Sequence, residues 1–202
     1  MTCYSNQRRV LFLDFDGVVR SFRNFIVDMD FDVVALKMIE KLQNECGFKI
    51  VISSTDRIII KDIEKFRQSL IADYGVTLNF HKRWRTPTLR NPHLIRMDAN
   101  AQKYMKHWSK EMSVEIDPDY YNIRFWRGFQ IQAWLNAEFE DVGEETDYLV
   151  LDDSRDMFPL KPKSVILVKK GESRGGMQLR HYDNIWGYFS SEKSTRKSIP
   201  KT

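Results

Sequence analysis

The chain has few cysteines and no long apolar run. Among its 202 residues there are only two cysteines, Cys3 and Cys46, and their wide separation matches no metal-ligand or redox motif. We therefore expect free thiols in a reducing compartment and no disulfide partner. No segment approaches the roughly twenty apolar residues that cross a bilayer, and the N-terminal residues lack the apolar region of a signal peptide. These features favour a cytoplasmic protein that does not enter a membrane.

The charge balance is only mildly basic. Lysine and arginine number 32 against 28 acidic residues, which gives a net charge of +4. Such a balance permits a polyanionic partner without requiring one. The length suits one well-buried domain, which we place at residues 1–189 with an insertion at about 81–126. Residues 190–202, rich in lysine and serine, are predicted to form a disordered basic tail.

Apolar strands and amphipathic helices alternate along the chain. Strands are predicted at residues 10–13, 49–52, 76–80, 148–151 and 164–168. Helices are predicted at residues 34–46, 60–74, 127–135 and 177–189, with one more at 99–112 inside the insertion. This alternation indicates an α/β, Rossmann-like three-layer sandwich with a central parallel sheet.

Two aspartates follow the first apolar strand, in the run Val-Leu-Phe-Leu-Asp-Phe-Asp-Gly. Strand alternation turns Asp14 and Asp16 to one side and Phe15 into the protein, and Gly17 permits a sharp turn. Two carboxylates this close repel each other unless a cation or a proton intervenes, and Mg²⁺ prefers carboxylate oxygens. A simple hairpin turn is the alternative. An EF-hand is excluded because apolar residues stand where its further ligands belong.

Polar residues also end two other predicted strands. In a parallel sheet these strand ends meet at one edge, where ligands bind. The residues concerned are Asp14 and Asp16, Ser53 and Ser54, and Asp152 and Asp153. Strand alternation predicts that only one of the last pair faces a metal, and Asp156 could join from the following loop. Arg127, at the start of a helix, is the candidate cation for a phosphate group, with Arg124 as the fallback.

These motifs, in this order, resemble the haloacid dehalogenase (HAD) superfamily over nearly the whole chain. The closer resemblance is to small phosphatase-like HAD domains associated with RNA repair proteins. It rests on Ser-Ser-Thr-Asp-Arg at 53–57, Thr-Pro at 86–87, Arg-Gly-x-x-Ile-x-x-Trp-Leu at 127–135 and Leu-Asp-Asp at 151–153. Asp56 stands where those domains usually have an aromatic residue, and the insertion is longer.

The resemblance implies a phosphatase with defined roles. Asp14 is the expected nucleophile, which forms an aspartyl-phosphate, and Asp16 is the expected general acid and base. Mg²⁺ is expected on Asp14, the main-chain carbonyl of Asp16, and Asp152 or Asp153. Ser53 or Ser54 would donate a hydrogen bond to the phosphate. Arg127 would take the place of the lysine that is usual in the superfamily.

The predicted insertion mixes cations with aromatic rings, a combination that can track a phosphate backbone and stack bases. The alternative is a structural role, in which the aromatic residues form a small core and the cations are solvated. The predicted substrate-binding residues are Ser54, Arg57, Arg83, Arg85 and Arg124. Only a minimal cap fits between the first motif and the next helix, which suits a large substrate.

We therefore expect a Mg²⁺-dependent phosphatase acting on RNA or DNA ends, most plausibly on a 3′-phosphate. A phosphatase of nucleotides or other small molecules is the alternative, and a catalytically silent nucleic-acid-binding module is a second.

Overall fold

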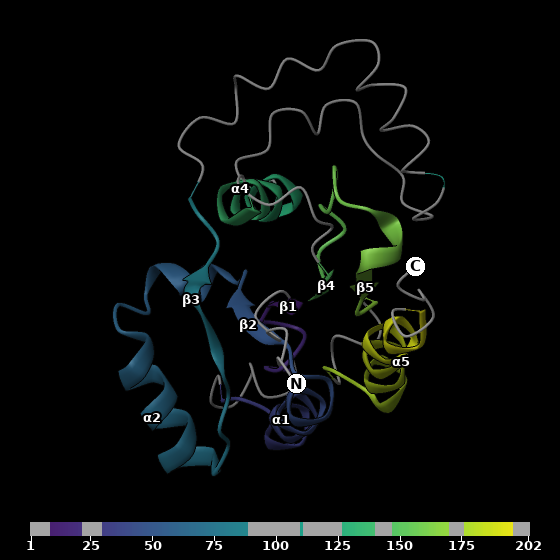
Figure 1. Cartoon of the computed structure of the whole chain (residues 1–202). Helices are drawn as coiled ribbons and strands as arrows, with labels where there is room; N and C mark the ends of the chain where they lie inside the picture. The colour runs from purple at the N-terminus through teal and green to yellow at the C-terminus, as the bar shows by residue number, and fades with distance from the viewer. Residues whose placement is uncertain are drawn as a thin grey trace, which may run out of the picture.

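A parallel sheet with helices on both faces forms the centre of the protein. The computed structural model describes residues 9–21, 30–88, 110, 127–139, 147–169 and 176–195. The strands are β1 (Arg9–Leu13), β2 (Lys49–Ile52), β3 (Phe80–Arg85), β4 (Asp147–Asp152) and β5 (Val165–Leu167), all parallel, in the order β3-β2-β1-β4-β5. The helices are α1 (Val33–Cys46), α2 (Ile63–Tyr74), α4 (Arg127–Phe139) and α5 (Leu179–Thr195). Figure 1 shows α4 above the sheet and α1 and α5 below it, so the predicted three-layer α/β fold is confirmed.

The central strand β1 divides two hydrophobic cores. All five of its residues are buried, and successive side chains point to opposite faces. Val10 and Phe12 belong to the core under α4, where the Phe12 ring meets Trp134 edge to face at 5.2 Å. Leu11 and Leu13 belong to the core shared with α1 and α5. Burial on both sides explains why this strand is a continuous apolar run.

The edge strand β3 lies further along the chain than the sequence predicts. The prediction of a strand at 76–80 was wrong, because the paired residues are Phe80–Arg85. Val76 and Leu78 are buried, but they lie in the segment that leads to the strand. The true strand carries exposed charges, which protect a sheet edge from pairing with other chains and hide its strand pattern. The first part of the predicted insertion, residues 81–85, therefore belongs to the sheet.

Helix boundaries also differ from the predictions. Helix α2 begins at Ile63 rather than at residue 60, because the Asp62 side chain caps it by accepting the N–H groups of Glu64 and Lys65. Helix α5 continues to Thr195, so the predicted disordered tail begins as helix, and residues 196–202 lie outside the described residues.

Most of the predicted insertion lies outside the described residues. The predicted helix at 99–112 lies outside the described residues except for residue 110, and the division into one domain and a tail stays a prediction. Cys46 is buried and forms no disulfide with another described residue. Within the described ranges, no helix combines the length and the apolar character needed to cross a bilayer.

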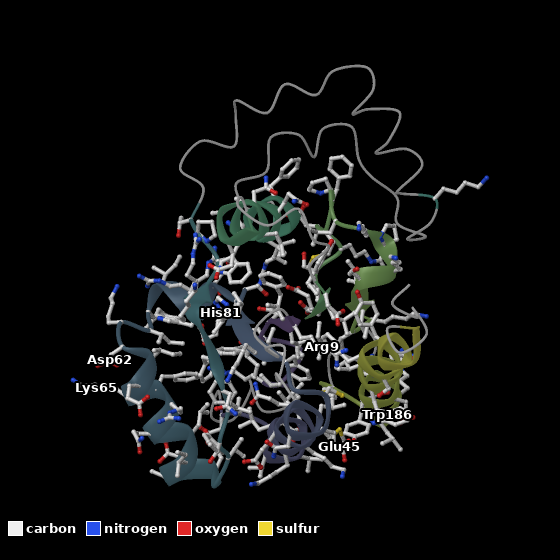
Figure 2. All side chains as sticks on the ribbon, viewed as in Figure 1. Arg9, Glu45, Asp62, Lys65, His81 and Trp186 are labelled. Carbon is white, nitrogen blue, oxygen red and sulfur yellow. The ribbon has the colours of Figure 1, made fainter. Side chains whose placement is uncertain are left out.

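A buried ion pair joins β1 to β4 at the edge of the sheet opposite to the acidic strand ends. Arg9 and Asp147 are register partners, and Arg9 Nε lies 3.1 Å from Asp147 Oδ2 with both side chains at most one-tenth exposed. Arg9 Nη1 also donates to the carbonyl of Cys46 at 3.1 Å. Figure 2 shows Arg9 beside α5 and Glu45 on α1. Glu45 pairs with the exposed Lys41 at 2.6 Å and accepts from the Tyr182 hydroxyl at 2.9 Å, also at an exposed position.

We predict that Asp147→Ala lowers the free energy of unfolding by about 3 kcal/mol or more, because it leaves the Arg9 charge buried without a carboxylate. Glu45→Ala is the matched control and should cost less than about 1 kcal/mol, because its pair is exposed. Urea denaturation measures both values. Equal losses in the two variants would contradict the prediction.

Candidate active site

Three carboxylates gather at the carboxyl ends of β1 and β4. Asp14 follows β1 and donates its N–H to the carbonyl of Leu151 at 3.1 Å, Asp152 ends β4, and Asp153 comes next. One oxygen of each carboxylate lies within 4.8 Å of the others, a grouping that could hold a metal ion. Asp152 and Asp153 both belong to this group, although strand alternation predicts that only one of them faces a metal, and which of them binds one stays a prediction. Because β4 ends at Asp152, the chain leaves the strand conformation before Asp153.

The acidic cluster is strongly desolvated. Burial raises the pKa of Asp152 well above its ordinary value, and burial together with the charge of Asp14 raises the pKa of Asp153 to about 6. Asp152 Oδ1 accepts the N–H of Ser154 at 2.8 Å, but Oδ2 has no hydrogen-bond partner among the described residues. Such a group of buried carboxylates requires positive charge nearby.

Arg127 supplies part of that charge from the first position of α4. Its Nη1 lies 3.0 Å from Asp14 Oδ1 and 3.3 Å from Asp152 Oδ2, and it also donates to the carbonyl of Ser53. Although burial opposes the charge of Arg127, the neighbouring carboxylates raise its pKa overall. In their charged forms the three carboxylates exceed the single guanidinium by two negative charges, and a divalent cation that prefers oxygen ligands would favour those charged forms over the protonated ones.

Asp156 holds the start of α4 in place. Its carboxylate accepts the N–H of Arg127 at 3.0 Å, and its main-chain carbonyl accepts the N–H of Gly128 at 2.8 Å. Burial raises the pKa of Asp156 to about 7. Asp156 lies outside the carboxylate group that could hold a metal, and its hydrogen bonds position Arg127 and Gly128 at the start of α4.

The carboxylate of Asp16 points to a different partner. Gly17 adopts a φ of 73° and turns the chain, as the sequence predicts, and Phe15 packs into the core. Asp16 Oδ1 accepts from Arg20 Nη1 at 3.0 Å, and the same nitrogen lies 2.9 Å from Asp56 Oδ2. Burial raises the pKa of Asp16, and the hydrogen bond from Arg20 opposes that shift.

Sequence reasoning missed Arg20. The only available signal was its position four residues after Asp16, across the glycine turn. Its guanidinium also lies 4.6 Å from the centre of the Phe31 ring, so a ring face and two carboxylates hold it in place.

The two serines after β2 have different surroundings. Ser53 is fully buried, and its hydroxyl has no hydrogen-bond partner in the described part of the chain. The Ser54 hydroxyl accepts the N–H of Asp56 at 3.3 Å and caps the short 3-10 helix Thr55–Ile58. Of the two alternatives, Ser53 thus has the uncommitted hydroxyl. The Ser53 carbonyl accepts from Arg127, which also contacts Asp14 and Asp152, so Ser53 is a neighbour of the acidic cluster.

Comparison with known families agrees with this geometry. A family model described as the HAD domain in Swiss Army Knife RNA repair proteins matches residues 10–178. The chain belongs to this HAD family. Comparisons with curated proteins and with solved structures each found no match.

Arg57 is an internal clamp of this HAD domain. It is 3 % exposed and donates to the carbonyls of Ser53, Ser54 and Thr86 and to the side chain of Gln130, at 2.7–3.2 Å. Burial and the nearby Arg127 lower the pKa of Arg57 to about 10. The clamp therefore ties the ends of β2 and β3 to α4. Gln130, which sequence reasoning missed, completes it, while a substrate-binding role for Arg57 stays a prediction.

The other predicted substrate-binding arginines lie on the edge strand of the HAD domain or beyond the described residues. Arg83 donates to the carbonyl of Ala137 at 2.7 Å and pairs with Glu138 at 3.4 Å. Arg85 donates to the carbonyl of Arg57 at 3.2 Å and stacks over Trp84. Arg124 lies outside the described residues.

Gly128 determines how closely α4 approaches the loop after β4. A Cβ at this position would overlap the main-chain oxygens of Met157 and Phe158. Glycine thus permits the contact through which Asp156 holds Arg127, and the Arg-Gly pair at the helix start was the signal in the sequence.

We predict that Gly128→Ala lowers the free energy of unfolding by about 1–3 kcal/mol, because main-chain atoms of the neighbouring loop must move. Gly187→Ala in α5 is the control, since nothing lies within 4 Å of its added Cβ. That substitution should leave stability unchanged or raise it by up to about 1 kcal/mol. Urea denaturation decides, and a Gly128→Ala variant as stable as the control would refute the packing argument.

Proposed function

We propose that this HAD domain is a Mg²⁺-dependent phosphomonoester hydrolase that acts on the ends of nucleic-acid strands, foremost on a 3′-phosphate of RNA. The observation that carries the proposal is the buried group Asp14, Asp152 and Asp153 facing Arg127 beside the unpartnered Ser53 hydroxyl. Membership of a family named for RNA repair proteins supports the class of substrate. A cytoplasmic location stays a prediction from the sequence.

The residues present suit a magnesium ion. Three carboxylates offer oxygen ligands, Asp152 Oδ2 lacks a hydrogen-bond partner among the described residues, and two negative charges remain after Arg127 is counted. Asp14, Asp152, Asp153 and the main-chain carbonyl of Asp16 would hold the ion. When bound, Mg²⁺ offsets the negative charge that gathers on the phosphoryl group during transfer.

Asp14 is the nucleophile of the proposed reaction. A carboxylate oxygen of Asp14 forms a bond to phosphorus while the bond between phosphorus and the leaving oxygen breaks, which gives an aspartyl-phosphate. Arg127 lies 3.0 Å from Asp14 Oδ1, so it directs the carboxylate and also offers N–H donors to the phosphate oxygens. Ser53 Oγ, which has no partner in the described residues, donates a further hydrogen bond to the phosphate.

Asp16 moves the protons. Its side chain is one-third exposed, two residues after the nucleophile, where a leaving group enters and leaves. It donates a proton to the leaving oxygen in the first step. In the second step it accepts a proton from the water that attacks phosphorus and releases Asp14. Arg20 orients the Asp16 carboxylate, because it is itself held by Asp56 and by the Phe31 ring.

We predict that Asp14→Asn lowers Mg²⁺-dependent phosphate release from a 3′-phosphorylated RNA oligonucleotide by about 1,000-fold or more, because an amide is a far weaker nucleophile than a carboxylate. Asp183→Asn, an exposed position on α5, is the control and should keep full activity. Chelation of the metal should abolish release, and added Mg²⁺ should restore it. An active Asp14→Asn variant would rule out the aspartyl-phosphate.

We also predict that the wild-type chain has a higher kcat/KM for a 3′-phosphorylated oligonucleotide than for the matching 3′-phosphorylated mononucleotide, by about tenfold or more. Contacts beyond the terminal nucleotide supply the difference. Preference for the mononucleotide would identify a small-molecule phosphatase instead. Tight oligonucleotide binding without turnover would identify a silent binding module.

A further inference from the structure

A basic pocket lies beside the active site, between β3, α4 and the 3-10 helix that follows β2. Its volume is about 380 Å³, which is the size of pockets that take small ligands or parts of larger ones. Four cationic residues line it, namely Arg57, Lys61, Arg83 and Arg85. Figure 2 labels His81, which lies on β3 in this part of the fold.

Most of the positive charge in the pocket is not balanced by acidic side chains. Arg83 pairs with Glu138 at 3.4 Å. Within the described ranges, no carboxylate forms an ion pair with Arg57, Lys61 or Arg85, whose recorded hydrogen bonds go to main-chain carbonyls and one amide. Lys61 and Arg85 are exposed. The pocket is therefore suited to an anion.

A buried hydroxyl without a partner also lines the pocket. Thr86 is 2 % exposed, and its Oγ1 has no hydrogen-bond partner among the described residues. Its main chain is fully used, because its N–H donates to Ile52 at 3.1 Å and its carbonyl accepts from Arg57 at 3.2 Å. Leaving a buried hydroxyl unpaired costs free energy, which a ligand oxygen would recover. This observation is independent of the charges.

Arg57 connects the pocket to the catalytic centre. Its Nη1 donates to the carbonyl of Ser53 at 3.2 Å, and Arg127 donates to that same oxygen. Arg57 is thus both a lining residue of the pocket and a hydrogen-bond partner of Ser53. Because they share Arg57, the pocket and the proposed phosphate site are neighbours, as are the terminal and the next phosphate groups of one strand.

We propose that this pocket binds the phosphodiester group next to the terminal phosphate of a single-stranded nucleic acid. The inference rests on the proposed function, which it deepens by naming a second subsite. Trp134, at the floor, is 1 % exposed and donates its indole N–H to the carbonyl of Arg83, so it offers no face for a base. Recognition here is of the backbone and is independent of base sequence.

The first test measures binding without turnover. The full-length Asp14→Asn chain, carrying Lys61→Gln and Arg85→Gln, is titrated with a fluorescent 3′-phosphorylated single-stranded RNA over a range of salt concentrations. Removing two phosphate contacts should reduce the slope of log K against log salt by about 1.4. Lys37→Gln with Lys41→Gln, on α1, makes the same change in net charge and should leave the slope unchanged. Equal slopes in the two double variants would overturn the proposal.

The second test separates a ligand contact from a structural hydroxyl. Thr86→Val should weaken RNA binding by about threefold to tenfold, the value of one ordinary hydrogen bond, without loss of thermal stability. A rise in Tm with unchanged RNA affinity would show that the hydroxyl is only an unsatisfied group, and would overturn its part in the subsite.

A kinetic measurement distinguishes failure of the subsite proposal from failure of the proposed function. In an otherwise wild-type chain, Lys61→Gln with Arg85→Gln should lower the ratio of kcat/KM for the 3′-phosphorylated oligonucleotide to that for the mononucleotide by about tenfold. An unchanged ratio in an active enzyme would overturn the subsite alone. Absence of phosphate release by the wild-type chain from both substrates would overturn the proposed function, and the salt dependence would still decide whether the pocket binds RNA.

Discussion

The repulsion between two buried carboxylates on adjacent strands is the constraint on which the rest of the active site depends. The parallel register sets Leu13 opposite Leu151, so Asp14 and Asp152 leave the sheet side by side in a region almost without solvent. Arg127 reduces this repulsion in part, and its side chain extends to the two carboxylates from α4, on one face of the sheet. The position of Arg127 depends on the hydrogen bonds of Asp156 and on the close approach of α4 to the neighbouring loop at Gly128. The position of a whole helix thus follows from the charge of two aspartates.

Charge is distributed unevenly along the carboxyl edge of the sheet. The β1 and β4 ends carry the acidic cluster, whereas the β2 and β3 ends carry Arg57, Arg85 and the serine hydroxyls. The Ser53 carbonyl lies at the boundary, where Arg57 and Arg127 both donate to it. In the proposed binding mode, the reacting phosphate of a nucleic-acid strand would lie at the acidic end and the backbone would continue towards the cationic end. Direction along the strand would then be read by charge rather than by bases.

Features that depend on hydrophobic periodicity, such as the buried strands, can be predicted from the sequence. Features that depend on tertiary pairing, such as the edge strand, are predicted poorly. Apolar runs predict β1, β2 and β4, and the rule that the ends of parallel strands share an edge predicts that Asp14, Ser53 and Asp152 lie together. Strand β3 was displaced because edge strands tolerate charges that obscure alternation.

The polar partners of the site were harder to predict. The position of Asp153 beside Asp14 and Asp152 does not follow from strand alternation, because alternation holds only within a strand and β4 ends one residue earlier. The role of Gln130 could not be predicted, because it depends on a hydrogen bond with Arg57, 73 residues away in sequence. No local pattern carries such information.

The close contact at Gly128 also bears on how the site can move. Main chain packs directly against main chain there, with no side chain between to act as a flexible spacer, so α4 and the loop that follows Asp153 behave as one rigid body. Arg127 and the β4 carboxylates are consequently preorganised relative to one another. Asp16, on the glycine turn, is held by the Arg20 side chain, so the orientation of its carboxylate does not depend on the contact at Gly128.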